Sequence, residues 1–193
     1  MDFTGKTVIV TGASSGIGAN AAKEFAKLGA NVTVCGRNVV NLHEVANECS
    51  ADGSKTLVIA GDVADLENAK NIIDETIKKF GQIDVLVNNA GVLEVGTIET
   101  TSIEQYDRVM NTNVRAIYHL TMLAVPHLIA TQGNIVNISS VNGIRSFPGV
   151  LAYNVSKAAL DQFTRCVALE LAPKNVRVNS VNPGKISSYH YNM

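Results

Sequence analysis

Four polar side chains in the second half of the chain are of the types that handle a proton on a substrate oxygen. Tyr153 and Lys157 lie four residues apart at the start of an expected helix, so a phenol and an ammonium share one face. Ser140 follows an expected strand, and Asn113 adds a polar group upstream. If the strands are parallel, these groups lie at the carboxyl edge of a sheet, where open α/β sheets bind ligands. The pattern predicts chemistry on a bound small molecule.

The composition around these residues favours a phenol over a carboxylate as the reacting group. Between Asp107 and Asp161 the sequence contains no Asp or Glu, while three arginines and Lys157 fall inside. This stretch offers no local carboxylate as a general base, which suits a phenol activated by a cation and not the paired carboxylates of a glycosidase or acid protease. Two buried elements that exclude charge would produce the same pattern.

A glycine-rich turn near the start of the chain is typical of a dinucleotide site. It follows the first expected strand and precedes a helix, so its glycines let the backbone approach a pyrophosphate at the helix N-terminus. The same letters match the G-x-S-x-G nucleophile elbow of hydrolases with Ser14 as nucleophile, but that elbow lies deeper in the sheet, with Asp and His downstream. The candidate cofactor residues of the turn are Gly12, Ser14, Ser15, Gly16, Ile17 and Gly18.

The ends of the next strands carry further candidate cofactor contacts. Gly36 leaves no carboxylate where an NAD site would place one, and Arg37 can pair with a 2′-phosphate, so NADP(H) is preferred and NAD(H) remains possible. A solvated arginine at a strand end is the alternative. Asp62 could accept a hydrogen bond from an adenine amino group or could only cap a helix. The candidates in these segments are Arg37, Asn38, Asp62, Val63, Asn89, Ala90 and Gly91.

The order of expected elements indicates an α/β fold with a doubly wound parallel sheet between two helical layers. Short, nearly continuous apolar runs alternate with helical patterns, as in parallel strands covered on both faces. Asp65 and Ser102 are expected N-caps, and Pro173 is expected to end the last helix. The expected strands are 7–11, 31–35, 56–60, 84–88, 134–139 and 177–181, and the expected helices are 16–28, 39–50, 65–80, 102–131 and 151–172.

Length and composition exclude several classes of protein. The chain has 193 residues, 46% of them hydrophobic and 17% charged, with a net charge of −1, which predicts one globular domain over 1–193 and excludes disorder. A net charge this close to zero gives no overall electrostatic attraction to nucleic acid or anionic membranes. The apolar runs are too short for a signal peptide core or a membrane span. Three scattered cysteines and four scattered histidines predict reduced thiols, no metal site and a cytoplasmic location.

The joint pattern resembles the short-chain dehydrogenase/reductases over essentially the whole chain, with members similar to 3-oxoacyl-(acyl-carrier-protein) reductase nearest in style. Ser140 lies thirteen residues before Tyr153 and Asn113 lies forty before it, close to the spacing of the catalytic tetrad of that family. The resemblance implies a Rossmann fold that binds NAD(P). The matching motifs are TGASSGIG at 11–18, NNAG at 88–91, Asn113, Ser140, YNVSK at 153–157 and Pro183-Gly184.

The resemblance also implies roles for the four polar residues in reducing a ketone or oxidising a secondary alcohol. Tyr153 would exchange the proton with the substrate oxygen, and Lys157 would lower the phenol pKa from its usual value near 10 and bind the nicotinamide ribose. Ser140 would orient the substrate, and Asn113 would hold a water that connects Lys157 to solvent. Pro183, Gly184 and Ser188 would contact the nicotinamide end of the cofactor.

The chain departs from the family pattern after Gly184, where only KISSYHYNM follows. Family members usually continue with a seventh strand and a helical lid over the substrate, so we expect both to be absent from this sequence. Two hypotheses therefore stand: an active oxidoreductase, and a truncated, catalytically impaired nucleotide-binding or interaction protein. By family analogy the helices 102–131 and 151–172 would pack across a homodimer or homotetramer interface.

Overall fold

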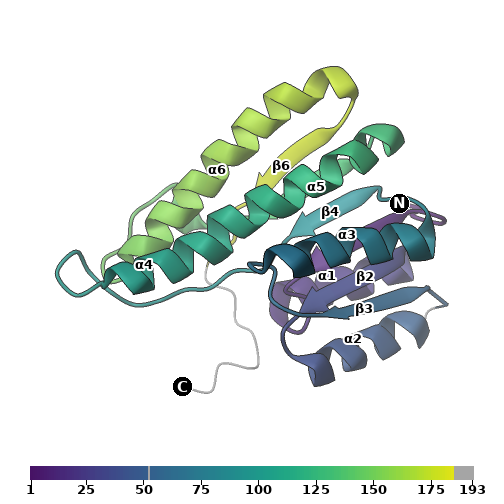
Figure 1. The fold of residues 1–193 in the computed structure, drawn as a ribbon, viewed down its shortest axis with the longest axis horizontal. Helices are drawn as coiled ribbons and strands as arrows, with labels where there is room; N and C mark the ends of the chain where they lie inside the picture. Colours follow the sequence, from purple (N-terminus) through teal and green to yellow (C-terminus); the bar gives the residue numbers. More distant parts are fainter. Residues whose placement is uncertain (52, 185–193) are drawn as a thin grey trace.

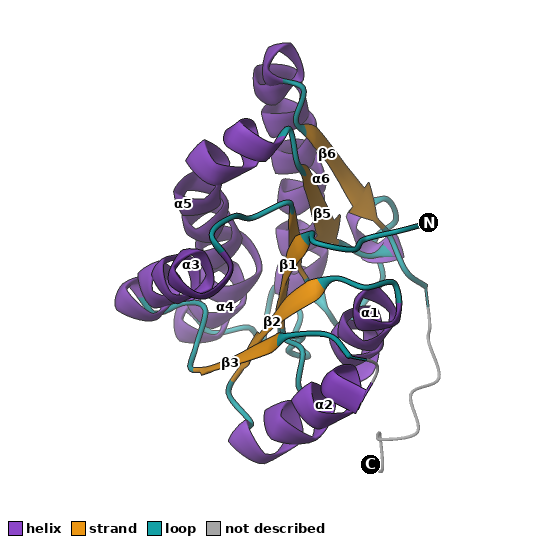
Figure 2. Ribbon diagram, turned by 90° about the vertical axis from the view of Figure 1, so that its right-hand side faces the viewer, coloured by secondary structure: helices purple, strands orange, loops and turns teal. Residues whose placement is uncertain are grey.

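A six-stranded parallel sheet forms the centre of the protein, for which the computed structural model describes residues 1–51 and 53–184. The strand order is β3-β2-β1-β4-β5-β6, so the direction of winding reverses between β1 and β4. Figure 2 shows this twisted sheet between its helices. The predicted doubly wound fold is confirmed. The strands are β1 (Thr7–Thr11), β2 (Asn31–Gly36), β3 (Thr56–Ala60), β4 (Val85–Asn88), β5 (Asn134–Ile138) and β6 (Arg177–Val181).

The helices cover the sheet in two layers (Figures 1 and 2). One apolar cluster joins α3, α5 and the end of α6 to one face of the sheet, and a second joins α1 and α2 to the other face. Both faces of the central strands are therefore buried, which explains why their sequences are almost uninterrupted apolar runs. The helices are α1 (Gly16–Lys27), α2 (Val39–Ala51), α3 (Leu66–Phe80), α4 (Ile103–Met110), α5 (Ala116–Thr131) and α6 (Leu151–Leu171).

The predicted helix caps are present. The carboxylate of Asp65 accepts from the Asn68 amide at 2.9 Å before α3, and the hydroxyl of Ser102 accepts from the Gln105 amide at 3.2 Å before α4. Each satisfies an amide that has no partner within its helix. Pro173 falls in a short 3-10 turn, η3 (Ala172–Lys174), directly after α6 ends at Leu171.

The predicted single helix over 102–131 is wrong in one respect, because a π-helical segment, η1 (Asn111–Arg115), separates α4 from α5. The Ala116 amide donates to the Asn111 carbonyl, five residues back, so one extra residue is accommodated in the turn. Periodicity alone does not reveal such a segment, because the helical path continues on both sides of it. Asn113 lies within η1, and its side chain is buried.

The sheet is less covered at β6 than at its centre. Val178 packs into the cluster beneath α5 and α6, whereas Arg177, Asn179 and Val181, which point to the opposite face, are exposed. The helices that the structure describes on that face, α1 and α2, pack over β1, β2 and β4. Among the described residues, none of the helices has the length and apolar character needed to cross a membrane.

Candidate functional site

A cleft of about 1180 Å³ opens along the carboxyl edge of the sheet, at the point where the strand order reverses. It brings together segments that are far apart in the sequence, as parallel strands require. The candidate cofactor residues up to Gly184 line it with one exception, together with Ser140, Tyr153 and Lys157. The exception is Gly18, which is buried and packs against the Gly12 main chain and the Asn89 side chain. Ser188 lies outside the described residues.

The glycine turn between β1 and α1 has the shape that a phosphate cradle needs. Gly12 has a φ of +63°, in the left-handed region that glycine adopts without a steric cost. Ser15 precedes α1 and makes no side-chain cap hydrogen bond, so the first amides of the helix remain open toward the cleft, where Gly16 and Ile17 are exposed. Open amides and the positive end of the helix dipole favour an anion at this position.

The segment 88–91 supports the glycine turn from the next strand. The side-chain amide of Asn89 donates to the carbonyl oxygens of Thr11 and Gly12, at 2.9 and 3.1 Å. The hydroxyl of Thr11 in turn accepts from the main-chain amides of Asn89 and Ala90, both at 3.0 Å. Asn89 lines the cleft, but its side-chain donors are used to hold the turn. Thr11 is a supporting residue that sequence reasoning did not single out, although it begins the glycine motif.

The end of β2 leaves an exposed cation at the rim of the cleft. Arg37 is exposed and, within the described part of the chain, forms no salt bridge. Asn38 accepts from the Asn41 amide at 3.1 Å and so helps to start α2. Gly36 faces Ser14, because a Cβ on Gly36 would lie 3.5 Å from the Ser14 hydroxyl. No acidic residue occurs at 36–38.

Asp62, at the end of β3, also lines the cleft. One of its carboxylate oxygens accepts from the Ala64 amide at 2.9 Å, which closes a short turn before α3. The side chain does not cap α3, because Asp65 does so. It lies at the cleft, where Val63 follows it.

Tyr153 and Lys157 occupy the first two turns of α6 and face the cleft. The Lys157 amine lies 5.6 Å from the centroid of the Tyr153 ring and donates to the Ile138 carbonyl at 2.7 Å. Burial lowers the pKa of Lys157 to about 8, and the nearby Asp161 carboxylate partly opposes that effect. The predicted pairing of a phenol and an amine on one face is confirmed.

Ser140 reaches the same edge from the end of β5. Its hydroxyl donates to the Asn142 side-chain carbonyl at 3.1 Å and accepts from the Asn142 main-chain amide at 3.2 Å. It thereby begins the short 3-10 turn η2 (Val141–Gly143). The main chain next to it is held by the segment after β6, because the Val141 amide donates to the Pro183 carbonyl at 3.0 Å.

Asn113 stands behind the cleft. Its side-chain oxygen accepts from the Val92 amide at 2.8 Å, and its side-chain amide donates to the Val92 carbonyl at 2.8 Å and to the Ser156 hydroxyl at 3.0 Å. A Cβ on Gly91 would lie 3.3 Å from the Asn113 oxygen and 3.6 Å from the Lys157 amine, so Gly91 lies between the two. Both donor hydrogens of the Asn113 side chain are used, and its hydrogen bonds join three elements.

Two further residues near this centre were missed by sequence reasoning. Asp161 is buried one helical turn after Lys157, and the Asn182 side chain donates to it from the end of β6. Asp161 ends the stretch after Asp107 that contains no Asp or Glu. In the folded chain its carboxylate lies near Lys157, so the site does have a carboxylate beside it. No sequence signal pairs Asp161 with Asn182, because the contact joins two elements 21 residues apart. Within the described residues, no group of three or more His, Cys, Asp or Glu side chains could hold a metal ion.

Comparison with known proteins places this fold and this cleft in one family. The family model for short chain dehydrogenase matches residues 6–192. The chain belongs to the short chain dehydrogenases. It is 37% identical over 189 residues to 3-oxoacyl-(acyl-carrier-protein) reductase FabG of Thermotoga maritima, a match that covers 97% of this chain and 77% of that protein. The family consists of NAD(P)-dependent oxidoreductases.

Solved structures of this short chain dehydrogenase family superpose closely on the chain. L-sorbose reductase from Gluconobacter frateurii, complexed with NADPH and L-sorbose, has a TM-score of 0.94 at 36% identity, with coverage of 97% of this chain and 72% of that one. A short-chain dehydrogenase/reductase from Caenorhabditis elegans, crystallised with its cofactor, has a TM-score of 0.90 at 42% identity, with coverage of 94% and 70%. A nicotinamide cofactor is therefore bound by at least one structural neighbour of this chain.

Proposed function

We propose that the chain transfers a hydride between NADP(H) and a ketone or secondary alcohol, with Tyr153 as the proton donor or acceptor. The observation that carries this proposal is the position of Tyr153 and Lys157, with the amine 5.6 Å from the ring centroid, in the same cleft as the glycine turn. A dinucleotide on the turn extends along that cleft toward the phenol. The cofactor supplies the hydride.

Four residues in and behind the cleft have separate roles in the proposed proton transfer. Tyr153 delivers a proton to the carbonyl oxygen during reduction and takes it back during oxidation. The charge of Lys157 favours the phenolate, because an ammonium close to the ring stabilises the negative oxygen. Ser140 holds the substrate oxygen beside the phenol. Asn113 acts as a positioning residue, since its side chain binds Val92 and Ser156 and so fixes the elements around Lys157.

The preference for NADP(H) over NAD(H) rests on the rim of the cleft at β2. Arg37 is exposed there, and residues 36–38 present no carboxylate that would repel a 2′-phosphate. A guanidinium can bind such a phosphate through two parallel hydrogen bonds. The open amides at the start of α1 would hold the pyrophosphate, with Asp62 and Val63 beside the adenine.

The main alternative is a catalytically impaired nucleotide-binding or interaction protein. A calorimetric titration with NADPH and NADH, followed by a panel of ketones and secondary alcohols, separates the two functions. Nucleotide binding with turnover of at least one carbonyl compound supports the oxidoreductase. Nucleotide binding with no turnover across the panel supports the alternative, and no binding at all contradicts the oxidoreductase and leaves the interaction protein.

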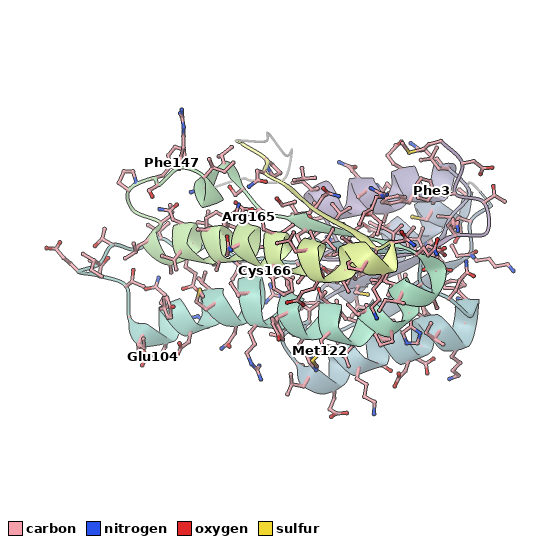
Figure 3. The ribbon with its side chains drawn as sticks, turned by 90° about the horizontal axis from the view of Figure 1, so that it is seen from above. Phe3, Glu104, Met122, Phe147, Arg165 and Cys166 are labelled. Carbon is pink, nitrogen blue, oxygen red and sulfur yellow. The ribbon has the colours of Figure 1, made fainter. Side chains whose placement is uncertain are left out.

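We also propose that the chain forms a homodimer or homotetramer through α5 and α6. Figure 3 shows these helices side by side, with Met122 on α5 and Cys166 on α6 at the outer surface. The tilted rings of Tyr118 and Phe163 contact each other between the helices, with their centroids 5.5 Å apart. Tyr118, Met122 and Leu169 are 59%, 54% and 79% exposed. Apolar side chains gathered on neighbouring helices are typical of a surface that another subunit covers.

A further inference from the structure

Asp161 is a buried carboxylate for which the proposed reaction has no direct use. It is 6% exposed on α6, and no Lys, Arg or His nitrogen among the described residues lies within salt-bridge distance of it. Burying a charge without an ion pair is costly unless hydrogen bonds replace its water. The hydrogen bonds to Asp161 therefore show how its buried charge is stabilised.

Asn182 provides this replacement from the end of β6. Its side-chain amide donates to both carboxylate oxygens of Asp161, at 3.1 and 2.9 Å, and to the main-chain carbonyl of Ser140 at 3.0 Å. The hydroxyl of Ser180 donates to the side-chain oxygen of Asn182 at 3.1 Å, which fixes the orientation of that amide. The Asn182 side chain thus connects the Asp161 carboxylate to the main chain of Ser140.

The short turn η2 closes over the carboxylate from the other side. A Cβ on Gly143 would overlap one carboxylate oxygen of Asp161 and would lie 2.9 Å from the Lys157 carbonyl. Only a glycine allows η2 to pack this closely on α6. Water therefore has little access, and the field of the carboxylate acts through protein and not through solvent.

Lys157 lies one helical turn before Asp161 and is buried, whereas Arg165, one turn after Asp161, is exposed. Residues four apart on a helix are neighbours, with Cβ atoms about 6 Å apart. Lys157 is itself 4% exposed, and its amine contacts a neutral carbonyl and not a carboxylate. Burial lowers its pKa, and the charge of Asp161 raises it.

We propose that Asp161 is a positioning residue of the reaction centre, whose buried carboxylate, fixed by Asn182, keeps Lys157 in its ammonium form beside Tyr153. The benefit of a charged Lys157 to catalysis rests on the proposed function. The effect of Asp161 on the charge of Lys157 does not depend on that function.

No other charge is placed to do the same work within the described residues. The groups that face Lys157 from β5, from the segment after β4 and from η1 are carbonyls, amides and hydroxyls, and on α6 itself they are Tyr153 and Asp161. Exposed charges are screened by water and salt. The remaining charged side chains on α6 and on the elements packed against it are all exposed: Glu104, Asp107, Arg108, Arg115, Arg145, Arg165, Glu170, Lys174 and Arg177.

The test is the titration of Lys157 by nuclear magnetic resonance of protein labelled with ¹³C-lysine, with the resonance assigned by its loss in Lys157→Met. In the wild type we expect one lysine to titrate near pH 8. Asp161→Asn keeps an oxygen that accepts from Asn182 and removes the charge, so the midpoint should fall by about one unit. Asp161→Glu keeps the charge and should restore most of the shift. If Asp161→Asn does not fold, Asp161→Ser carries the same expectation.

Glu170→Gln is the matched control, because it removes one exposed negative charge from the same helix and should leave the midpoint unchanged. An unchanged midpoint in Asp161→Asn, or an equal fall in Glu170→Gln, overturns the proposal. The readout needs no substrate and no turnover. Loss of activity on the carbonyl panel with the expected Lys157 titration would therefore contradict the proposed function and still support the role of Asp161.

Discussion

Asn113 and Ser156 join η1 to α6 through a hydrogen bond of 3.0 Å from the side-chain amide to the hydroxyl. Ser156 also donates to the Tyr153 carbonyl at 2.8 Å, within the turn of α6 that carries the phenol. Asn113 holds Val92 with its remaining groups, so the segment after β4, η1 and α6 meet at one fully buried amide. A π-helical segment is costly unless something fixes it, and π segments are frequent at functional sites.

Replacement of Asn113 by Ala is therefore expected to lower the free energy of unfolding by about 3 kcal/mol, because it leaves the Val92 amide and carbonyl without partners. Urea denaturation followed by circular dichroism measures this change. Asn111→Ala is the control, since Asn111 lies in the same segment with an exposed side chain, and its cost should be below about 0.5 kcal/mol. Equal costs for the two variants would mean that the side chain of Asn113 does not hold η1.

Tyr153→Phe removes the phenolic oxygen and keeps the ring against Lys157. We expect turnover of the best carbonyl substrate to fall by at least about a hundredfold, since a positioned general acid contributes that much or more. The NADPH dissociation constant should stay within about twofold of the wild type. Tyr118→Phe, on the outer surface of α5, serves as the control and should retain full turnover. Unchanged turnover in Tyr153→Phe would remove the phenol from the mechanism.

Arg37→Ala tests the choice of cofactor. Hydrogen bonds from a guanidinium to a phosphate are worth about 1.5–3 kcal/mol, so NADPH should bind about tenfold more weakly or worse, with NADH affected less than about twofold. Calorimetric titration with each nucleotide gives both constants. Arg165→Ala removes an exposed arginine from α6 (Figure 3) and should change neither. Equal weakening of NADPH and NADH would contradict a contact to the 2′-phosphate.

The parts of the site that follow from local sequence were predicted well, and the parts that depend on packing were not. The glycine turn, the caps at Asp65 and Ser102 and the strand ends are encoded within a few residues, so their patterns are visible in the sequence. The bridge from Asp161 to Asn182 joins two elements whose register is set by the whole sheet. The segment η1 depends on Val92, which lies 21 residues before Asn113. Neither relationship leaves a periodic signal.

The pKa of Lys157 predicts a specific dependence of stability on pH. Its pKa is about 8 in the folded protein and 10.5 in its unperturbed state, so the unfolded chain binds more protons between these values. The penalty for burying the ammonium is complete below about pH 8 and is relieved as the pH rises toward 10.5. Relative to Lys157→Met, the wild type should gain up to about 3 kcal/mol over that interval.

Urea unfolding of both proteins at several pH values measures this gain, and other titrating groups cancel in the difference. Lys27→Met, an exposed lysine at the end of α1, is the control and should differ from the wild type by a constant amount. A constant difference for Lys157→Met as well would mean that Lys157 keeps an ordinary pKa in the folded state.

The exposed apolar side chains on α5 and α6 predict self-association. Sedimentation velocity at micromolar concentration should show a dimer or tetramer, and Met122→Glu should shift it toward the monomer, because a carboxylate buried between two copies has no partner. Leu66→Glu places the same charge on an exposed position of α3 and should leave the assembly intact. A wild-type monomer, or an assembly that Met122→Glu does not weaken, would exclude this surface as the interface. The face of α5 and α6 would then need another explanation for its low polarity.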